Sequence, residues 1–192
     1  MVVMRRFAAV WMFTVVALPV AAFGEANADD PSNVSVCDIA RQPERFNGKL
    51  VTVRSRIDIA FEEFQLSGRA CESPKIDGVW LEYGKGRKRQ PTTWCCGDMV
   101  PRDGLSVLQN ADFRTFHRYL TTQSRRSGCY EGQCYLYSVT ATITGRVDAA
   151  PLETCPNGKG LCCIGGFGHL GVSCARLVIQ RVSGVVAERR PR

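Results

Sequence analysis

Ten cysteines in a chain of 192 residues constrain the fold more than any other feature of this sequence. The number is even, and cysteines at this density are typical of exported domains that disulfides hold together. We expect all ten to be paired, but five bridges allow about 900 connectivities, so counting cannot give the pairing. The positions are Cys37, Cys71, Cys95, Cys96, Cys129, Cys134, Cys155, Cys162, Cys163 and Cys174.

Local spacing suggests a few of these bridges. Cys129 and Cys134 flank a short glycine-containing loop that a disulfide could close, and Cys155 could pair with Cys162 or Cys163 across another turn-rich loop. The doublets at 95–96 and 162–163 are expected to reach different partners, because neighbouring side chains on a strand point to opposite faces.

The N-terminus has the pattern of an export signal. Arg5 and Arg6 precede an apolar run, Phe7–Ala22, and Ala26-Asn27-Ala28 matches a cleavage site. The sequence predicts a signal peptide over residues 1–28, with cleavage after Gly24 as the alternative. Removal of that segment takes two arginines and one glutamate from a net charge of +7 and leaves +6. No later apolar run is long enough to span a membrane. We expect a periplasmic or secreted protein.

The sequence contains little that indicates a metal or cofactor site. Zinc sites use closely paired cysteines, often with histidine, and the only histidines are His117 and His169. We expect no metal and no cofactor, and we expect His117 to be a helix-surface residue. Residues 166–171 match G-x-G-x-x-G, but a cysteine-rich loop precedes them and a strand is predicted after them. The motif therefore indicates a tight loop in which backbone approaches backbone.

Hydrophobic periodicity predicts a mainly β chain of 159 residues, 29–187, in one domain. A capping box at Ser35 opens a short helix, and Asn110 caps a second one with an apolar aromatic stripe. A cysteine- and glycine-rich loop is predicted from Leu152 to Ser173, and a charged, frayed tail over residues 188–192. The predicted strands cover residues 50–59, 64–66, 79–83, 135–147 and 175–186, and the second helix covers 111–121.

Five strands with a helix between the third and fourth are the arrangement of an OB-like Greek-key barrel. The turn Phe46-Asn47-Gly48-Lys49 leading into Leu50–Arg56 resembles the opening of OB-fold domains of the tRNA-anticodon-binding type. The chain as a whole also resembles a group of uncharacterised exported bacterial proteins, through Cys37-Asp38-Ile39, Trp80-Leu81-Glu82, Cys95-Cys96-Gly97 and the glycine loop. These resemblances imply a fold with disulfide-stapled loops and imply no reaction.

Exposed basic residues suggest what the protein binds. We expect a ligand face over the second and third strands, beside the basic loop, and the polar face of the first strand adds two arginines. The predicted members are Trp80, Tyr83, Lys85, Arg87, Lys88 and Arg89, with Arg54 and Arg56 on the first strand. An exported cationic protein suits an anionic glycan, a lipid headgroup or an envelope partner, and its compartment disfavours nucleic acid.

The sequence favours a binding module over an enzyme and identifies no catalytic residue. The alternatives are a small hydrolase that uses carboxylates in the loops, such as Glu62, Glu63, Asp98 and Asp103, or a structural envelope protein.

Overall fold

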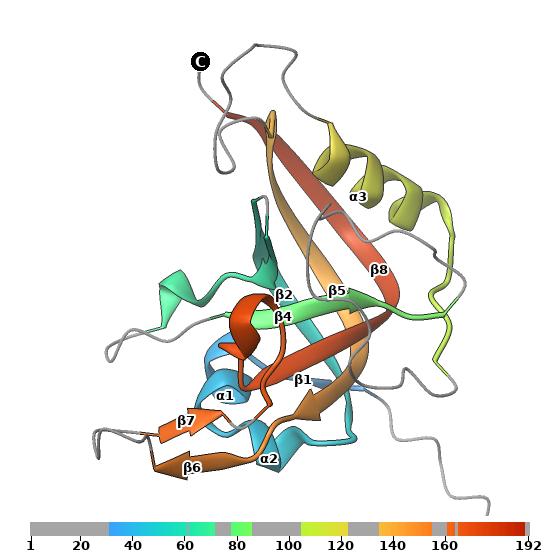
Figure 1. Cartoon of the computed structure of the whole chain (residues 1–192). Coiled ribbons are helices and arrows are strands. Elements are labelled where there is room, and N and C mark those ends of the chain that lie inside the picture. Colours follow the sequence, from blue (N-terminus) through green and yellow to red (C-terminus); the bar gives the residue numbers. More distant parts are fainter. Residues whose placement is uncertain are drawn as a thin grey trace, which may run out of the picture.

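The computed structural model describes residues 31–60, 62–71, 78–85, 105–122, 135–154, 161–163 and 165–190. Five strands among them form a closed barrel: β2 (Leu50–Ala60), β3 (Glu63–Leu66), β4 (Val79–Tyr83), β5 (Tyr137–Ala149) and β8 (Ala175–Arg189). They pair in the order β2–β3–β4–β8–β5, and β5 returns to pair with β2. Only β4 and β8 run parallel; the other barrel pairs are antiparallel. The long strands β5 and β8 lie side by side along the molecule (Figure 1).

Alternation along the strands places one set of side chains in the barrel core. Val51, Val53 and Ile57 of β2 are fully buried, as the period-two pattern predicted. Val139, Ala141 and Ile143 of β5 and Leu177, Ile179 and Val182 of β8 complete the same core. The prediction of a mainly β chain with a helix after the third barrel strand is confirmed.

Helix α3 (Ala111–Thr121) lies between β4 and β5 in the chain and packs beside β8 and β5 (Figure 1). The Asn110 side chain accepts a hydrogen bond from the Phe113 amide at 2.8 Å, so the predicted cap is present. Phe113, Phe116 and Leu120 are buried, which confirms that the aromatic stripe is core.

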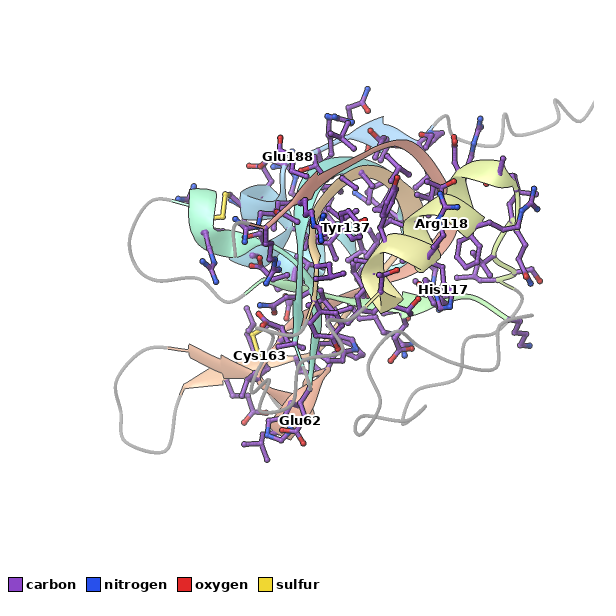
Figure 2. The ribbon with its side chains drawn as sticks, turned by 90° about the horizontal axis from the view of Figure 1, so that it is seen from above. Glu62, His117, Arg118, Tyr137, Cys163 and Glu188 are labelled. Carbon is purple, nitrogen blue, oxygen red and sulfur yellow. A yellow bond between two sulfur atoms is a disulfide. The ribbon has the colours of Figure 1, made fainter. Side chains whose placement is uncertain are left out.

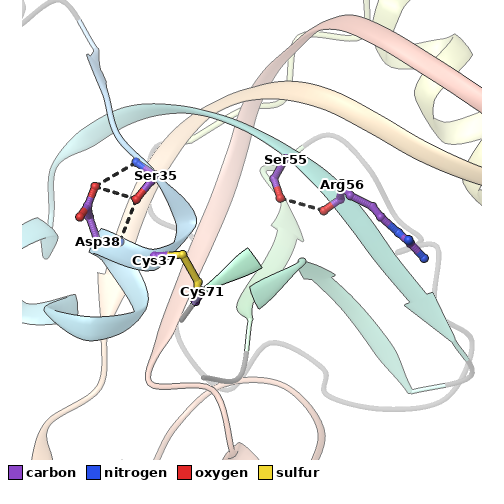
Figure 3. Close-up of a disulfide and its surroundings, with 6 residues drawn as sticks. All are labelled: Ser35, Cys37, Asp38, Ser55, Arg56 and Cys71. Atoms are coloured by element: carbon purple, nitrogen blue, oxygen red, sulfur yellow. Dashed lines mark hydrogen bonds between the residues drawn. A yellow bond between two sulfur atoms is a disulfide. The ribbon is translucent and has the colours of Figure 1, made fainter. Parts of the chain in front are cut away.

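Two short helices precede the barrel. Helix α1 (Val36–Arg41) begins with the predicted capping box, in which Ser35 Oγ accepts from the Asp38 amide at 3.1 Å (Figure 3). Helix α2 (Pro43–Phe46) was not predicted, because a proline shortly after a helix usually marks the end of helical structure. Proline instead occupies the first turn of α2, where its missing N–H is not needed.

Several boundaries differ from the predictions. The segment expected to be a loop contains a hairpin of β6 (Leu152–Thr154) and β7 (Leu161–Cys163), followed by the turn η2 (His169–Gly171). β8 continues to Arg189, and Glu188 pairs with Ser138. The strand therefore includes the first two residues of the predicted tail, 188–192. The remaining short elements are β1 (Ser32–Asn33), parallel to β2, and η1 (Gly68–Ala70).

Two disulfides are seen within the described residues. Cys37 is bonded to Cys71, which ties α1 to the end of η1 (Figure 3), and Cys163 is bonded to Cys174. Cys163 therefore does not pair with Cys155. The predicted pairing of Cys95, Cys96, Cys129, Cys134 and Cys155, and the predicted signal peptide, fall outside the described residues; only the backbone of Cys162 is described. No helix of the described ranges is long and apolar enough to cross a membrane.

Candidate anion-binding face

The two aromatic residues predicted to stack on a ligand lie in the core. The Tyr83 ring is fully buried, with edge-to-face contacts to Phe64 and Phe113, and its hydroxyl lies 3.0 Å from His117 Nδ1. Trp80 is only 5% exposed, because the glycine loop covers it. Neither ring can stack on a ligand, so we remove both from the predicted face.

His117, which we predicted to be a helix-surface residue, is partly covered by its neighbours. Its ring stacks on Phe113 with centroids 6.2 Å apart, in addition to the Tyr83 contact. The side chain is half-buried, and it joins α3 to β4. Figure 2 shows it on the helix side of the molecule, next to Arg118.

The predicted basic loop is described only at its first residue. Lys85 is exposed and pairs through its backbone with the segment after residue 104: its amide donates to the Leu105 carbonyl. Arg87, Lys88 and Arg89 lie outside the described residues. In the barrel order, β3 separates β4 from β2 on one side, and β8 and β5 separate them on the other. Lys85 therefore follows a strand that does not adjoin the one carrying Arg54 and Arg56.

The two strand arginines point outward as predicted and belong to a larger polar surface. In the pairing register, Arg54 lies opposite Thr142, which lies opposite Ser183; Thr52, Thr144 and Arg181 form the row beside it. Arg56 lies opposite Thr140 in a third row. We name this outer surface of β2, β5 and β8 the arginine–threonine face; its members are Thr52, Arg54, Arg56, Thr140, Thr142, Thr144, Arg181 and Ser183.

Hydrogen bonds across the strands hold part of this face in place. Arg54 Nη1 donates to Thr142 Oγ1 at 3.2 Å and to the Gly184 carbonyl at 3.1 Å. The hydroxyls of Thr52 and Thr144 are 3.0 Å apart. Arg181 is exposed, and its side chain has no hydrogen bond or ion pair to any residue that the structure describes. In these two rows the face thus offers the guanidinium group of Arg54, which is held in place, and that of Arg181, which is available to a ligand. Hydroxyl groups lie between them.

The face has a uniform charge. Its three rows contain three arginines and no carboxylate, and Val186, opposite Thr140, is the large apolar side chain exposed beside it. Rows on a strand repeat about every 7 Å and strands lie about 5 Å apart, so the surface can meet an extended ligand at several points. Guanidinium groups and hydroxyls together suit sulfate, phosphate or carboxylate groups carried on a polar backbone.

A mixed-charge cluster borders the face beyond Arg56. Arg56 Nε and Arg69 Nε lie 3.5 and 3.6 Å from the two oxygens of the buried Asp58 carboxylate. Burial, together with the charge of Asp58, raises the pKa of Glu63, which accepts a hydrogen bond from Gln65. Burial and the nearby Arg56 and Arg69 lower the pKa of Arg190.

Of the carboxylates considered for hydrolysis, the two that the structure describes, Glu62 and Glu63, contact different partners. Glu62 Oε2 lies 3.2 Å from His169 Nδ1 and so faces the glycine loop (Figure 2 shows Glu62 on the side of Cys163), whereas Glu63 faces Gln65. Asp98 and Asp103 lie outside the described residues. Within the described ranges no group of three or more metal-ligating side chains is found.

The opposite border of the face is an ion network with a structural role. Arg176 is 1% exposed and bonds Asp148 at 2.6 Å and Glu82 at 2.8 Å, and Arg146 shares the Asp148 carboxylate at 2.6 Å. The Phe167 ring covers the Arg176 guanidinium, with its centroid 4.9 Å away. Because these charges satisfy one another beneath the glycine loop, they hold the loop on the barrel and are closed to a ligand.

The glycine motif is the tight loop that the sequence predicted. A side chain at Gly166 would overlap backbone of the same loop, and a Cβ at Gly168, where φ is +77°, would lie 2.7 Å from Cδ2 of Trp80. Phe167 and Ser173 pair through two backbone hydrogen bonds at 2.8 and 3.1 Å. These close approaches explain the glycines without any bound nucleotide.

Sequence reasoning missed six members of the face and Arg69. The alternation of Thr140, Thr142 and Thr144 with buried residues does show that the threonines point outward. Which strand lies beside them, and which residue stands opposite each one, depends on barrel closure and on the irregular β5–β8 register. That information is not local in the sequence.

Neither protein-family models, nor curated proteins, nor solved structures give a match to this chain. The geometry of the arginine–threonine face is therefore the main indication of what the protein binds.

Proposed function

We propose that this protein is an exported, disulfide-stabilised binding module that holds an anionic glycan on its arginine–threonine face. The observation that carries the proposal is the face itself: three arginines and five hydroxyl side chains in adjoining rows of β2, β5 and β8, without a carboxylate among them. An extended polyanion can meet several of these groups at once, which gains more than any single contact.

The composition of the face favours a glycan over the other anionic partners. A stable protein interface needs an apolar, often aromatic, centre, and insertion into a bilayer surface needs exposed large apolar side chains. Among the described residues the face offers only Val186 for either purpose. Hydroxyls spaced between guanidinium groups can instead exchange hydrogen bonds with sugar hydroxyls while the arginines meet the charged substituents.

The compartment belongs to the same proposal. The residues 1–28 pattern, ten cysteines and the two bridges among the described residues are what an oxidising space outside the cytoplasm favours. Polyanionic glycans are abundant in such spaces, whereas nucleic acid is not the expected partner there.

We also propose that the barrel is of the OB type. Support comes from the strand order β2–β3–β4–β8–β5–β2, from the single parallel pair in the barrel, and from α3 between the third and fourth barrel strands. The proposed ligand face then lies on β2, β5 and β8 rather than on β3 and β4, because the aromatic side chains of β4 are buried.

Heparin, a sulfated polysaccharide, is a suitable probe for the proposal. We expect Arg54→Ser and Arg181→Ser each to elute from immobilised heparin at lower salt than the wild-type protein, and the double variant at lower salt still. The control is Arg45→Ser, which removes an exposed arginine of α2 and gives the same net charge as each single variant.

The control separates a site from general attraction to a basic protein. If Arg45→Ser lowers the elution salt as much as Arg54→Ser or Arg181→Ser does, the face is not the binding site. A further variant in which Lys85, Arg87, Lys88 and Arg89 are all replaced by serine tests the predicted basic loop. A loss of retention confined to this variant would place the glycan there instead.

A further inference from the structure

Two arginines at the end of the face share one buried carboxylate. Asp58 is 5% exposed, and its two oxygens each lie near a different guanidinium group, Arg56 at 3.5 Å and Arg69 at 3.6 Å. Both approaches are made by Nε. They are too long for strong hydrogen bonds, so Asp58 orients the two groups without satisfying them.

The outer nitrogens of both groups are available. The Arg56 and Arg69 side chains are 45% and 75% exposed, and within the described part of the chain neither guanidinium group makes a hydrogen bond. Each guanidinium group therefore still has its paired donors for an acceptor from outside.

The backbone holds the two arginines next to each other. The Ser67 amide donates to the Arg56 carbonyl at 2.9 Å, just before η1. Arg69 lies inside η1, and the disulfide Cys37–Cys71 fixes the residue that follows η1 to helix α1 (Figure 3). Little chain ordering would be needed to bring the donors together, which favours binding.

The surrounding charges favour an anion. Arg190 adds a third guanidinium group near Arg56 and Arg69, and the carboxylates close by are Asp58 and Glu63. The cluster is therefore positive by one charge when both carboxylates are ionised.

We infer that Arg56 and Arg69 form a two-arginine clamp for a single tetrahedral oxyanion, a sulfate or phosphate monoester group. Asp58 positions the clamp from behind, and the Nη atoms of both arginines donate to the oxyanion. The inference rests on the proposed function in that Arg56 also belongs to the arginine–threonine face, and it names the substituent that a bound glycan would present there.

The clamp is tested by calorimetric titration of the folded protein with inorganic sulfate, N-acetylglucosamine 6-sulfate, and phosphatidylcholine vesicles containing phosphatidic acid. Arg69 is largely exposed and lies outside the face, so Arg69→Ser should fold normally, which thermal unfolding checks. Because Arg69→Ser lacks one guanidinium group, its affinity for sulfate should be about tenfold weaker than that of the wild type. Arg45→Ser is the control of equal charge.

Arg69→Lys distinguishes the clamp from a diffuse charge effect. Lysine keeps the charge but lacks the planar pair of donors. The affinity of Arg69→Lys for sulfate should therefore fall between those of the wild type and Arg69→Ser. Tighter binding of the sulfated sugar than of inorganic sulfate identifies a glycan as the source of the oxyanion, and tighter binding of the vesicles identifies a lipid. Either result supports the clamp if Arg69→Ser weakens the binding of that probe.

Two results overturn the clamp: no binding of any probe by the wild type, or equal affinities of Arg69→Ser and Arg45→Ser. The clamp and the proposed function fail separately. Retention on heparin that depends on Arg54 and Arg181, with sulfate affinity unchanged by Arg69→Ser, would leave the function and remove the clamp. The opposite pattern would leave the clamp and remove the glycan face.

Discussion

Arg176 carries a charge into a region that solvent does not reach. It is 1% exposed, and its partners Glu82 and Asp148 are themselves buried or nearly so. Removing one member of a buried ion network leaves the others uncompensated, which costs much more than the network contributes relative to apolar residues.

We therefore expect Arg176→Met to lower the free energy of unfolding by about 3–5 kcal/mol. Arg114→Met, at an exposed position of α3, should change it by less than about 0.5 kcal/mol. Urea unfolding of both variants measures the difference. Equal effects would mean that the network does not hold the glycine loop on the barrel.

Glu63 gives the molecule a stability that depends on pH. Its pKa is raised above the usual value of a glutamate, first by burial and then by the charge of Asp58. The folded state thus binds this proton more readily than the unfolded state. The associated stabilisation is fully present below the unfolded pKa and is lost as the pH rises through the folded pKa.

Glu63→Gln should accordingly be more stable than the wild type at pH 7, and the difference should shrink toward pH 4.5. The amide can still accept from Gln65, so the local contact is kept. Thermal unfolding across this pH range measures the effect. A difference that grows on acidification would contradict the raised pKa.

At the residue scale, local patterns predicted orientation better than accessibility. Alternation along β2 correctly predicted that Arg54 and Arg56 point outward. The sequence of β4 did not indicate that Trp80 is covered by a loop more than 80 residues later in the chain, or that Tyr83 is covered by α3. A strand residue is exposed only if no distant segment packs on it, and a sequence pattern does not contain that information.

Among the elements, the loop from 165 to 174 is constrained by close approach at two of its glycines, Gly166 and Gly168. It is closed by Cys163–Cys174 and by the Phe167–Ser173 backbone pair, and Gly168 lies directly on the Trp80 ring. Its tip, Leu170, has φ of +55°, which costs a residue with a side chain about 1 kcal/mol.

Gly168→Ala should destabilise the loop through both strain and overlap, by about 2–4 kcal/mol. Gly165→Ala is the matched control, because Gly165 also has positive φ but has nothing within 4 Å of an added Cβ, and it should lose only about 1 kcal/mol. Hydrogen exchange of the Phe167 and Ser173 amides reports the effect. Faster exchange to the same extent in both variants would show that contact with Trp80 is unimportant.

The elements themselves were predictable where their signals are local. The capping box at Ser35 and the Asn110 cap bond as predicted, because a cap involves only residues three apart. The ends of β5 and β8 were misplaced by two or three residues, since their length is set by pairing with each other. The β6–β7 hairpin was missed because its strands are only three residues long.

For the whole molecule, closure of the barrel creates the face. β5 pairs with both β2 and β8, so their outward side chains form adjoining rows although they lie 40 to 130 residues apart in the chain. The net charge of +7 predicted an anionic partner in general terms. The position of the face depends on strand order and register, which the sequence left open.

The most direct test of this account is an amide chemical-shift titration of the isotopically labelled protein with a heparin-derived oligosaccharide. We predict that the largest shifts fall on Arg54, Thr142 and Ser183 and their neighbours in the three rows, that they diminish with added salt, and that α3 is little affected. The largest shifts on Val79–Tyr83, Lys85 or α3, with the rows of β2, β5 and β8 unchanged, would contradict the account.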